Sequence, residues 1–175
     1  MHASCILFAE RVIKKEEVFG KSVLEVGSLN VNGSIKDSIL MFKPQVYTGI
    51  DMRDGLNVDL VCNSSDLIKT FGEESFDVVL CFNTLEHIED WKTAIHNIKG
   101  VCKKDGIILI TTVSKGFQKH DYPNDYWRYE LDDMKAIFSD CEIRQEKDPE
   151  IPGVFLKARK IGIENDLSDI VINCV

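Results

Sequence analysis

The sequence lacks several features that would mark particular classes of protein. No apolar run approaches the length of a membrane span, and the first apolar patch, residues 5–9, is too short for the core of a signal peptide. The six cysteines include no C-x-x-C pair, the spacing typical of zinc and thioredoxin-like sites, so we expect no metal centre. We therefore expect a cytoplasmic protein with reduced cysteines and no membrane partner.

Positive charge is also in short supply. Lysine and arginine together number 21 against 29 aspartates and glutamates, which gives a formal net charge of −8. An acidic chain repels phosphate backbones, so we do not expect nucleic acid as its main partner. The length of 175 residues fits a single domain, 1–175, with an N-terminal helical arm at 1–20 and a tail at 161–175. The tail either packs as an extra element or frays.

What the sequence does contain is a regular alternation of short apolar runs and amphipathic stretches. The apolar runs show little polar alternation, which is typical of strands buried on both faces of a parallel sheet. They lie at residues 22–26, 46–50, 58–62, 76–82 and 107–113. Apolar residues at helical spacing fall at 3–18, 34–42, 65–71, 90–102 and 130–138. This alternation predicts βαβ units with right-handed crossovers and a doubly wound sheet.

Two further apolar runs, at 141–145 and 154–158, follow the last predicted helix. The segment between them, 146–153, is too short to hold a crossover helix, so these two strands should be antiparallel. We therefore predict an α/β fold with a Rossmann-like doubly wound sheet of about seven strands, the last of them antiparallel. Helices should cover both faces and give a three-layer α/β/α arrangement.

Ligands bind outside the carboxyl ends of the strands in sheets of this kind, so the loops that follow the strands carry the functional signals. The first strand runs into Gly27 within V-L-E-V-G-S-L-N-V-N-G-S, and a helix is expected from about Ser34. Such a turn either holds an anionic ligand at the helix start or is an ordinary strand-to-helix turn. The next glycine is Gly33, so the fingerprint G-x-G-x-x-G is absent, which disfavours a nicotinamide dehydrogenase.

The next two loops offer polar groups for a nucleoside. Asp51 ends the run V-Y-T-G-I-D, where a carboxylate can accept hydrogen bonds from both hydroxyls of a ribose; otherwise it caps a helix or a turn. Asn63 follows the third run, and its amide carries the donor and the acceptor that a purine edge requires. Alternatively, Ser64 or Ser65 in this loop simply caps the next helix.

The last two loops carry the candidates for acceptor chemistry. In F-D-V-V-L-C-F-N-T-L-E-H-I-E-D-W, Glu86 and His87 follow the fourth strand and are catalytic, structural or merely exposed. The fifth loop, 114–129, is longer than most connections and contains His120 and Arg128 among aromatic residues. The aromatic side chains either line a pocket or cover the edge of the core; they are Tyr122, Tyr126, Trp127 and Tyr129.

These motifs together resemble the class I S-adenosylmethionine-dependent methyltransferases, most closely the methyltransferase type 11 group, over about residues 22–134. The most specific likeness is F-D-V-V-L-C-F-N-T-L-E-H, which is similar to the family's F-D-x-V-x-x-x-x-x-L-E-H. The resemblance implies S-adenosylmethionine as cofactor and S-adenosylhomocysteine as product. The cofactor positions that it implies are Glu25, Gly27, Ser28, Asn30, Gly33, Asp51, Met52, Asn63, Ser64, Cys81, Phe82 and Asn83.

The resemblance also implies a role for several of these positions. Gly27 would lie against the methionine part of the cofactor, Asp51 would hold the ribose hydroxyls, and Met52 would lie beside the adenine. Asn63 would face the adenine amino group, and Ser64 would offer a backbone N–H. Residues at the end of the fourth strand would complete the site, with backbone from Cys81 and Phe82 and lining by Asn83 and His87.

The sequence departs from the family pattern at two places. The usual E/D-x-G-x-G-x-G has Leu29 and Val31 in place of its second and third glycines, and the adenine-facing aspartate is an asparagine. Asn30 and Gly33 can supply the turn by another route, since asparagine tolerates a left-handed backbone. Many relatives have more helix before the first strand, so the 114–129 loop, or a second subunit in a homodimer, must cover the substrate here.

The implied reaction is methyl transfer from the sulfonium to a nucleophile on a small molecule. His120 is the first candidate for the base that removes the acceptor's proton, and His87 is the second. Arg128 either pairs with an acidic group of the substrate or holds the loop through Asp121 or Asp125. The stretch H-D-Y-P-N-D-Y-W-R-Y resembles one in relatives that act on sugars or polysaccharide precursors. Its aromatic residues would shape the pocket, namely Tyr122, Tyr126 and Trp127.

Two other functions compete with this one. A catalytically silent S-adenosylmethionine-binding module, or a subunit of a larger complex, would keep the cofactor loops and need no polar residues in the fifth loop. A nucleic-acid or protein methyltransferase would need a basic surface or an added recognition domain, and neither is visible in the sequence. In addition, N-T-L-E stands where enzymes that methylate nucleobases often carry N/D-P-P-Y.

Overall fold

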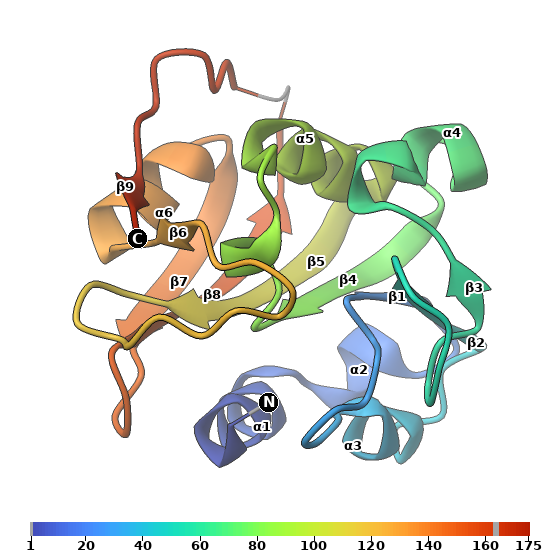
Figure 1. Ribbon diagram of the computed structural model, residues 1–175. Coiled ribbons are helices and arrows are strands. Elements are labelled where there is room, and N and C mark those ends of the chain that lie inside the picture. The colour runs from blue at the N-terminus through green and yellow to red at the C-terminus, as the bar shows by residue number, and fades with distance from the viewer. Residues whose placement is uncertain (1, 163–164) are drawn as a thin grey trace.

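The computed structural model describes residues 2–162 and 165–175, so Met1 of the expected arm and residues 163–164 of the expected tail lie outside the described residues. A seven-stranded sheet in the order β3-β2-β1-β4-β5-β8-β7 forms the centre of the molecule (Figure 1). Its strands are β1 (Ser22–Val26), β2 (Val46–Asp51), β3 (Leu60–Val61), β4 (Phe76–Phe82), β5 (Cys102–Val113), β7 (Cys141–Lys147) and β8 (Gly153–Lys160). The predicted Rossmann-like α/β fold is confirmed.

The pairing of the strands also agrees with the prediction. Strand β1 lies between β2 and β4, and β1 to β5 are parallel to one another. Strand β8 is antiparallel to both of its neighbours, β5 and β7, because the short turn between β7 and β8 leaves no room for a crossover helix. Strand β3 is shorter than the predicted run 58–62. The Asp59 carboxylate accepts a hydrogen bond from the Gly49 N–H at 2.7 Å, and the Asp59 N–H donates to the Gly49 carbonyl at 2.7 Å. These two bonds take the place of regular strand pairing at Asp59.

Helices cover both faces of the sheet, which gives the three predicted layers (Figure 1). On one face, Val78 and Leu80 of β4 belong to an apolar cluster with Phe8 and Ile39. Val79 and Cys81, their neighbours along β4, point to the opposite face and belong to a second apolar cluster, because successive side chains of a strand point to alternate faces of the sheet. The first face carries α1 (Ala3–Val12), α2 (Lys15–Val18) and α3 (Lys36–Leu40), and the second carries α4 (Leu67–Phe71), α5 (Trp91–Val101) and α6 (Leu131–Ile137).

The single helix expected over 3–18 is wrong, since it is broken into α1 and α2. Ile13 has an extended backbone, with φ −86° and ψ 136°, and ends α1. The Lys157 ammonium from β8 donates to the carbonyl of Val12 at 2.7 Å and to the carboxylate of Glu17. This lysine satisfies a carbonyl that the end of α1 leaves open and ties both short helices to the sheet.

The described residues of the expected tail, 161–162 and 165–175, include an ordered element that packs on the domain. Strand β9 (Asn173–Cys174) pairs antiparallel with β6 (Trp127–Arg128), and Ile172 is buried. Strand β9 therefore holds the long loop after β5 in place. The paired residues Arg128 and Asn173 are 45 positions apart, so no local pattern of the sequence indicates this contact. Among the described residues, no helix is long and apolar enough to cross a membrane.

Candidate active site

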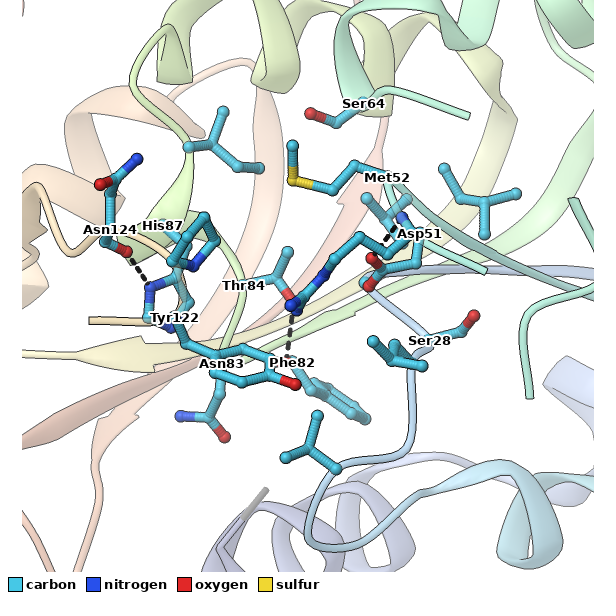
Figure 2. A pocket seen from close by; sticks show the side chains of 18 of the residues that line it. Ser28, Asp51, Met52, Ser64, Phe82, Asn83, Thr84, His87, Tyr122 and Asn124 are labelled. Carbon is cyan, nitrogen blue, oxygen red and sulfur yellow. Dashed lines mark hydrogen bonds between the residues drawn. The ribbon is translucent and has the colours of Figure 1, made fainter. Parts of the chain in front are cut away.

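A cavity of about 600 Å³ opens at the carboxyl ends of β1, β2, β3 and β4. Its walls come from the loops that follow these strands, and residues 120–124 and 126 of the long loop form the remaining side. Figure 2 shows Asp51 and Ser28 on one side of this space, and His87 and Tyr122 on the other. The position agrees with the rule for open α/β sheets, and the volume is that of a pocket for a small molecule.

The turn after β1 can only be made by glycine. Gly27 has φ +78°, and a Cβ atom there would lie 2.1 Å from Oγ1 of Thr84. The backbone N–H groups of Gly27 and Ser28 both donate to the carbonyl of Ile50 at 2.9 Å, which binds the turn to β2. The chain therefore bends sharply at the cavity wall, and a ligand can approach its backbone.

Asn30 supports the rest of this loop, in which Leu29 and Val31 stand in place of glycines. Oδ1 of Asn30 accepts a hydrogen bond from the N–H of Gly33 at 3.0 Å, and the Asn30 N–H donates to the carbonyl of Leu56. Leu29 packs on the open side of Gly55, where a Cβ atom would lie 2.4 Å from its Cδ1. The altered motif thus folds as a self-supported turn, and Leu29, Gly33 and Val31 still line the cavity.

The acidic residue of the first strand is buried at the edge of the cavity. Oε2 of Glu25 accepts a hydrogen bond from the Tyr47 hydroxyl at 2.5 Å, and the residue is 1% exposed. Burial raises the pKa of Glu25 to about 7, although the tyrosine bond works in the opposite direction. Ser28 is also buried, and its hydroxyl donates to the carbonyl of Asn57 at 3.0 Å.

The two nucleoside-side loops present Asp51 and Asn63 to the same cavity. Oδ1 of Asp51 accepts from the N–H of Arg53 at 3.0 Å, and the side chain lies at the end of β2 as expected. Oδ1 of Asn63 accepts from the N–H of Ser65 at 2.9 Å, so asparagine, and neither serine, caps the following 3₁₀ turn Ser64–Asp66. Asn63 also lines the cavity, so its amide NH₂ can reach a ligand there. Met52 and Ser64 line the cavity beside them.

The end of β4 places Phe82 and Asn83 in the cavity wall but leaves Cys81 out of it. The side chain of Cys81 is fully buried in the core, so only its backbone could meet a cofactor, and that expectation stays a prediction. Asn83 has φ +47°, and its Oδ1 accepts from the Cys5 thiol at 3.1 Å. Thr84, which the sequence did not single out, fills the space beside Gly27.

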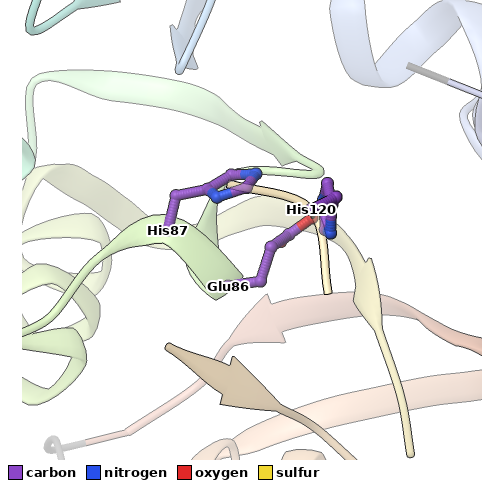
Figure 3. Close-up of side chains that lie close together, drawn as sticks. All are labelled: Glu86, His87 and His120. Atoms are coloured by element: carbon purple, nitrogen blue, oxygen red, sulfur yellow. Dashed lines mark ion pairs between the residues drawn. The ribbon is translucent and has the colours of Figure 1, made fainter. Parts of the chain in front are cut away.

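Beyond Asn83 lies a cluster of Glu86, His87 and His120 (Figure 3). Nδ1 of His87 lies 2.5 Å from the carbonyl oxygen of Asn124, and the two imidazole rings are 4.9 Å apart. Nε2 of His120 lies 4.0 Å from Oε1 of Glu86, while its Nδ1 lies 3.0 Å from Oδ2 of Asp125. Both histidines expected at the acceptor end are therefore together, and the long loop delivers one of them.

Arg128 holds the loop, which favours the second of the two roles considered for it. Its guanidinium makes a bidentate pair with the buried carboxylate of Asp125, at 2.6 and 2.7 Å, and also donates to the carbonyls of Phe117 and Gln118. Burial alone would raise the pKa of Asp125, but the bonds from Arg128 and from the His120 N–H lower it to about 2. Asp121 was the other partner considered for Arg128; its Oδ1 instead lies 3.5 Å from Nζ of Lys119.

The four aromatic residues of the loop divide between the cavity and the core. Tyr122 and Tyr126 line the cavity, as expected. Trp127 does not line it: the indole N–H donates to the carbonyls of Ile88 and Glu89, so the ring secures the loop against the end of the 3₁₀ turn Leu85–His87. Tyr129 is fully buried and closes the core, which was the alternative considered for it.

Comparison with known proteins agrees with this geometry. Residues 43–110 match the family model described as "Methyltransferase domain". A "Ubiquinone biosynthesis O-methyltransferase" from Coxiella burnetii is 26% identical over 116 residues, which cover 59% of this chain and 48% of that protein. The chain thus spans about half the length of the curated relatives that it matches.

Solved structures share the fold. The 1,6-didemethyltoxoflavin-N1-methyltransferase of Burkholderia thailandensis has a crystal structure with bound 1,6-didemethyltoxoflavin and S-adenosylhomocysteine. It superposes on this chain with a TM-score of 0.68 at 16% identity, covering 90% of this chain and 78% of that one. A SAM-dependent methyltransferase from Aquifex aeolicus superposes with a TM-score of 0.66, also at 16% identity, and the match covers 92% of this chain and 94% of that one. The resemblance to class I methyltransferases is confirmed.

Proposed function

We propose, from the premise that this chain carries a methyltransferase domain with the class I S-adenosylmethionine-dependent fold, that it transfers a methyl group from S-adenosylmethionine to a small molecule. The observation that carries the proposal is one cavity at the carboxyl ends of β1 to β4. The Gly27 turn, the Asp51 carboxylate and the Asn63 amide line this cavity together with His87 and His120, and Figure 2 shows Asp51 and His87 on opposite sides of it. Cofactor and acceptor can therefore meet in one enclosed space.

The cofactor side supplies a matching group for each part of S-adenosylmethionine. The half-buried Gly27 turn lines the cavity where the methionine part would approach, and the Asp51 carboxylate can accept from the ribose hydroxyls. The free NH₂ of Asn63 can donate to a ring nitrogen of adenine. Glu25, when ionised, places a negative charge near a cofactor that carries a positive sulfonium.

The acceptor side supplies a base. A hydroxyl oxygen of the acceptor would attack the methyl carbon, the carbon–sulfur bond would break, and S-adenosylhomocysteine would leave with the electron pair on sulfur. Nε2 of His120 would take the hydroxyl proton, with Asp125 beside its Nδ1 to orient the ring and balance the charge. His87 is the second candidate for the same role, and Tyr122 and Tyr126 would enclose the acceptor.

An oxygen acceptor is favoured by the curated relatives, whose printed names describe O-methyltransferases. The earlier expectation of a sugar or polysaccharide precursor rests only on the likeness of one loop, so it stays a prediction. The expected homodimer and the absence of a nucleic-acid partner also stay predictions. A silent binding module is not favoured, because that role would not require two histidines beside the buried Glu86 at the acceptor end of the cavity.

Formation of S-adenosylhomocysteine in the presence of candidate acceptors tests the proposal. The purified chain would be incubated with S-adenosylmethionine and separate panels of phenols, catechols, sugars and carboxylic acids. We expect product with at least one panel, and its loss in Asp51→Ala but not in the control Asp54→Ala, since Asp54 is exposed and outside the cavity wall. Tight cofactor binding with no product from any panel would favour the silent module.

A further inference from the structure

Three side chains at the acceptor end of the cavity converge on one point. Glu86 and His87 come from the 3₁₀ turn after β4, and His120 comes from the long loop after β5. Each offers one ligand atom, and these atoms all lie within 4.8 Å of one another (Figure 3). We propose that Glu86, His87 and His120 bind a divalent transition-metal ion such as Zn²⁺ or Mn²⁺. From the sequence we expected no metal centre, because the metal motifs considered there require cysteine pairs.

The carboxylate of Glu86 is the observation that points to a cation. The residue is fully buried, and its Oε2 accepts from the Thr112 hydroxyl at 2.8 Å. Its Oε1 is buried as well but has no hydrogen-bond partner among the described residues. The nearest nitrogen of His120 is 4.0 Å away, too far for a hydrogen bond. A buried carboxylate oxygen without a partner costs several kcal/mol, and a metal ion would supply what is missing.

The second ring nitrogen of His87 is held as it usually is in metal ligands. The Asn124 carbonyl can only accept, so Nδ1 of His87 carries the proton and its Nε2 has a free lone pair. Ligating histidines commonly donate their second nitrogen to a carbonyl or a carboxylate in this way. Nδ1 of His120 lies 3.0 Å from Oδ2 of Asp125 without making a hydrogen bond to a described residue, and Arg128 keeps that carboxylate in place through two hydrogen bonds.

Two nitrogens and one carboxylate oxygen favour a borderline transition-metal ion over Mg²⁺ or Ca²⁺. Ligand atoms about 2.1 Å from one ion would lie roughly 3.4 Å apart, so separations of up to 4.8 Å in the cluster must shorten by up to about 1.4 Å. The side chain of His120 is 37% exposed and belongs to a surface loop, so a small rotation of its ring can provide this movement.

Three protein ligands leave coordination positions open toward the cavity. An acceptor hydroxyl bound there would lose its proton more readily, because a metal ion lowers the pKa of a bound oxygen acid. This step rests on the proposed function and changes one part of it: the ion, in place of a free His120 ring, would activate the acceptor. The acceptors best suited are those whose oxygens can coordinate a metal, such as vicinal hydroxyls on an aromatic ring.

Metal titration without cofactor or acceptor tests the site. The purified chain, dialysed against a chelator and then buffer, would be titrated with ZnCl₂ and with MnCl₂ in a calorimeter. We expect one equivalent to bind, with affinity reduced at least about tenfold in His120→Ala and in His87→Ala. The control His96→Ala removes an exposed imidazole on α5, outside the cluster, and should bind as the wild type does. His120 is partly exposed, so its variant should fold, and a thermal melt would check this.

The outcome of that titration is separable from the outcome of the proposed function. Absence of saturable binding, or equal binding by wild type and His120→Ala, would overturn the metal site. A titration with S-adenosylmethionine on the same samples reports on the cofactor independently. Metal binding without cofactor binding would leave the site standing and remove the methyltransferase proposal, whereas cofactor binding without metal binding would do the reverse.

Discussion

The guanidinium of Arg53 lies over the ring of Tyr122, and Cζ of Arg53 is 4.3 Å from the centroid of that ring. Arg53 belongs to the loop that carries Asp51, and Tyr122 belongs to the loop that carries His120. The contact therefore joins the cofactor side of the cavity to its acceptor side across the mouth, where Figure 2 shows the ring of Tyr122. Such a cation–π contact at a partly exposed position contributes about 0.5–1 kcal/mol.

Arg53→Ala and Tyr122→Ala should each weaken the binding of S-adenosylmethionine by about two- to fivefold, which corresponds to the loss of this contact. The double variant should lose no more than either single variant, because both remove the same interaction. Calorimetry on the three variants would measure this, with Arg11→Ala as a control for an exposed arginine far from the cavity. Additive losses would mean that the two residues act separately.

Gly27→Ala should destabilise the fold much more than Gly20→Ala. Both glycines have positive φ, +78° and +68°, so each alanine adds about 1 kcal/mol of backbone strain. Only Gly27 has a neighbour in the way, and its clash with Thr84 should add about 1–3 kcal/mol, whereas nothing lies within 4 Å of a Cβ at Gly20. Urea unfolding would measure both. Adding Thr84→Ala should recover part of the Gly27→Ala loss, and equal losses for the two glycines would contradict the close approach.

The buried carboxyl of Glu25 should make stability depend on pH. Its pKa rises from 4.5 to about 7 on folding, so the folded state binds the proton more tightly than the unfolded state. The free energy of unfolding should therefore fall by up to about 3 kcal/mol as pH rises from about 4.5 to about 7. Glu25→Gln should lack this contribution and should gain stability relative to the wild type over that range. Urea unfolding at several pH values, with the exposed Glu16→Gln as control, would show it; parallel curves for wild type and Glu25→Gln would contradict the raised pKa.

Arg128→Ala should reduce stability by about 3 kcal/mol, because it leaves the Asp125 carboxylate buried without its partner. Thermal and urea unfolding would measure the loss. A loop-holding role predicts that Asp125→Ala, in which the arginine loses its partner, is also destabilised. If Arg128 instead bound an acidic substrate, Arg128→Ala would keep wild-type stability and raise only KM.

Local patterns predicted most of the sheet. The predicted bounds of β1 and β4 match those of the structure, because dense apolar runs flanked by polar residues define buried strands on their own. The antiparallel pair β7–β8 was also predictable, since chain length alone excludes a crossover there. The break between α1 and α2 was not, because it depends on Lys157, more than 140 residues away.

The candidate site was predictable where one loop carries the whole signal and not where several loops meet. Gly27 and Asp51 were found because each follows a strand in a pattern of its own. Glu86 was noticed but not selected, since only the fold shows that its second oxygen has no partner and faces His120. Both roles stayed open for Arg128, because nothing in the sequence tells an arginine facing a cavity from one paired with a buried aspartate.

Calorimetric titration of the purified chain with S-adenosylmethionine, S-adenosylhomocysteine and NAD tests the central claim most directly. We predict micromolar binding of the first two, no binding of NAD, and affinity about 10–100-fold weaker in Asp51→Ala, which loses hydrogen bonds to a charged group. Asp54→Ala should bind as the wild type does. Failure of both adenosyl compounds to bind, or binding that Asp51→Ala leaves unchanged, would contradict the assignment of this cavity to the methyl donor.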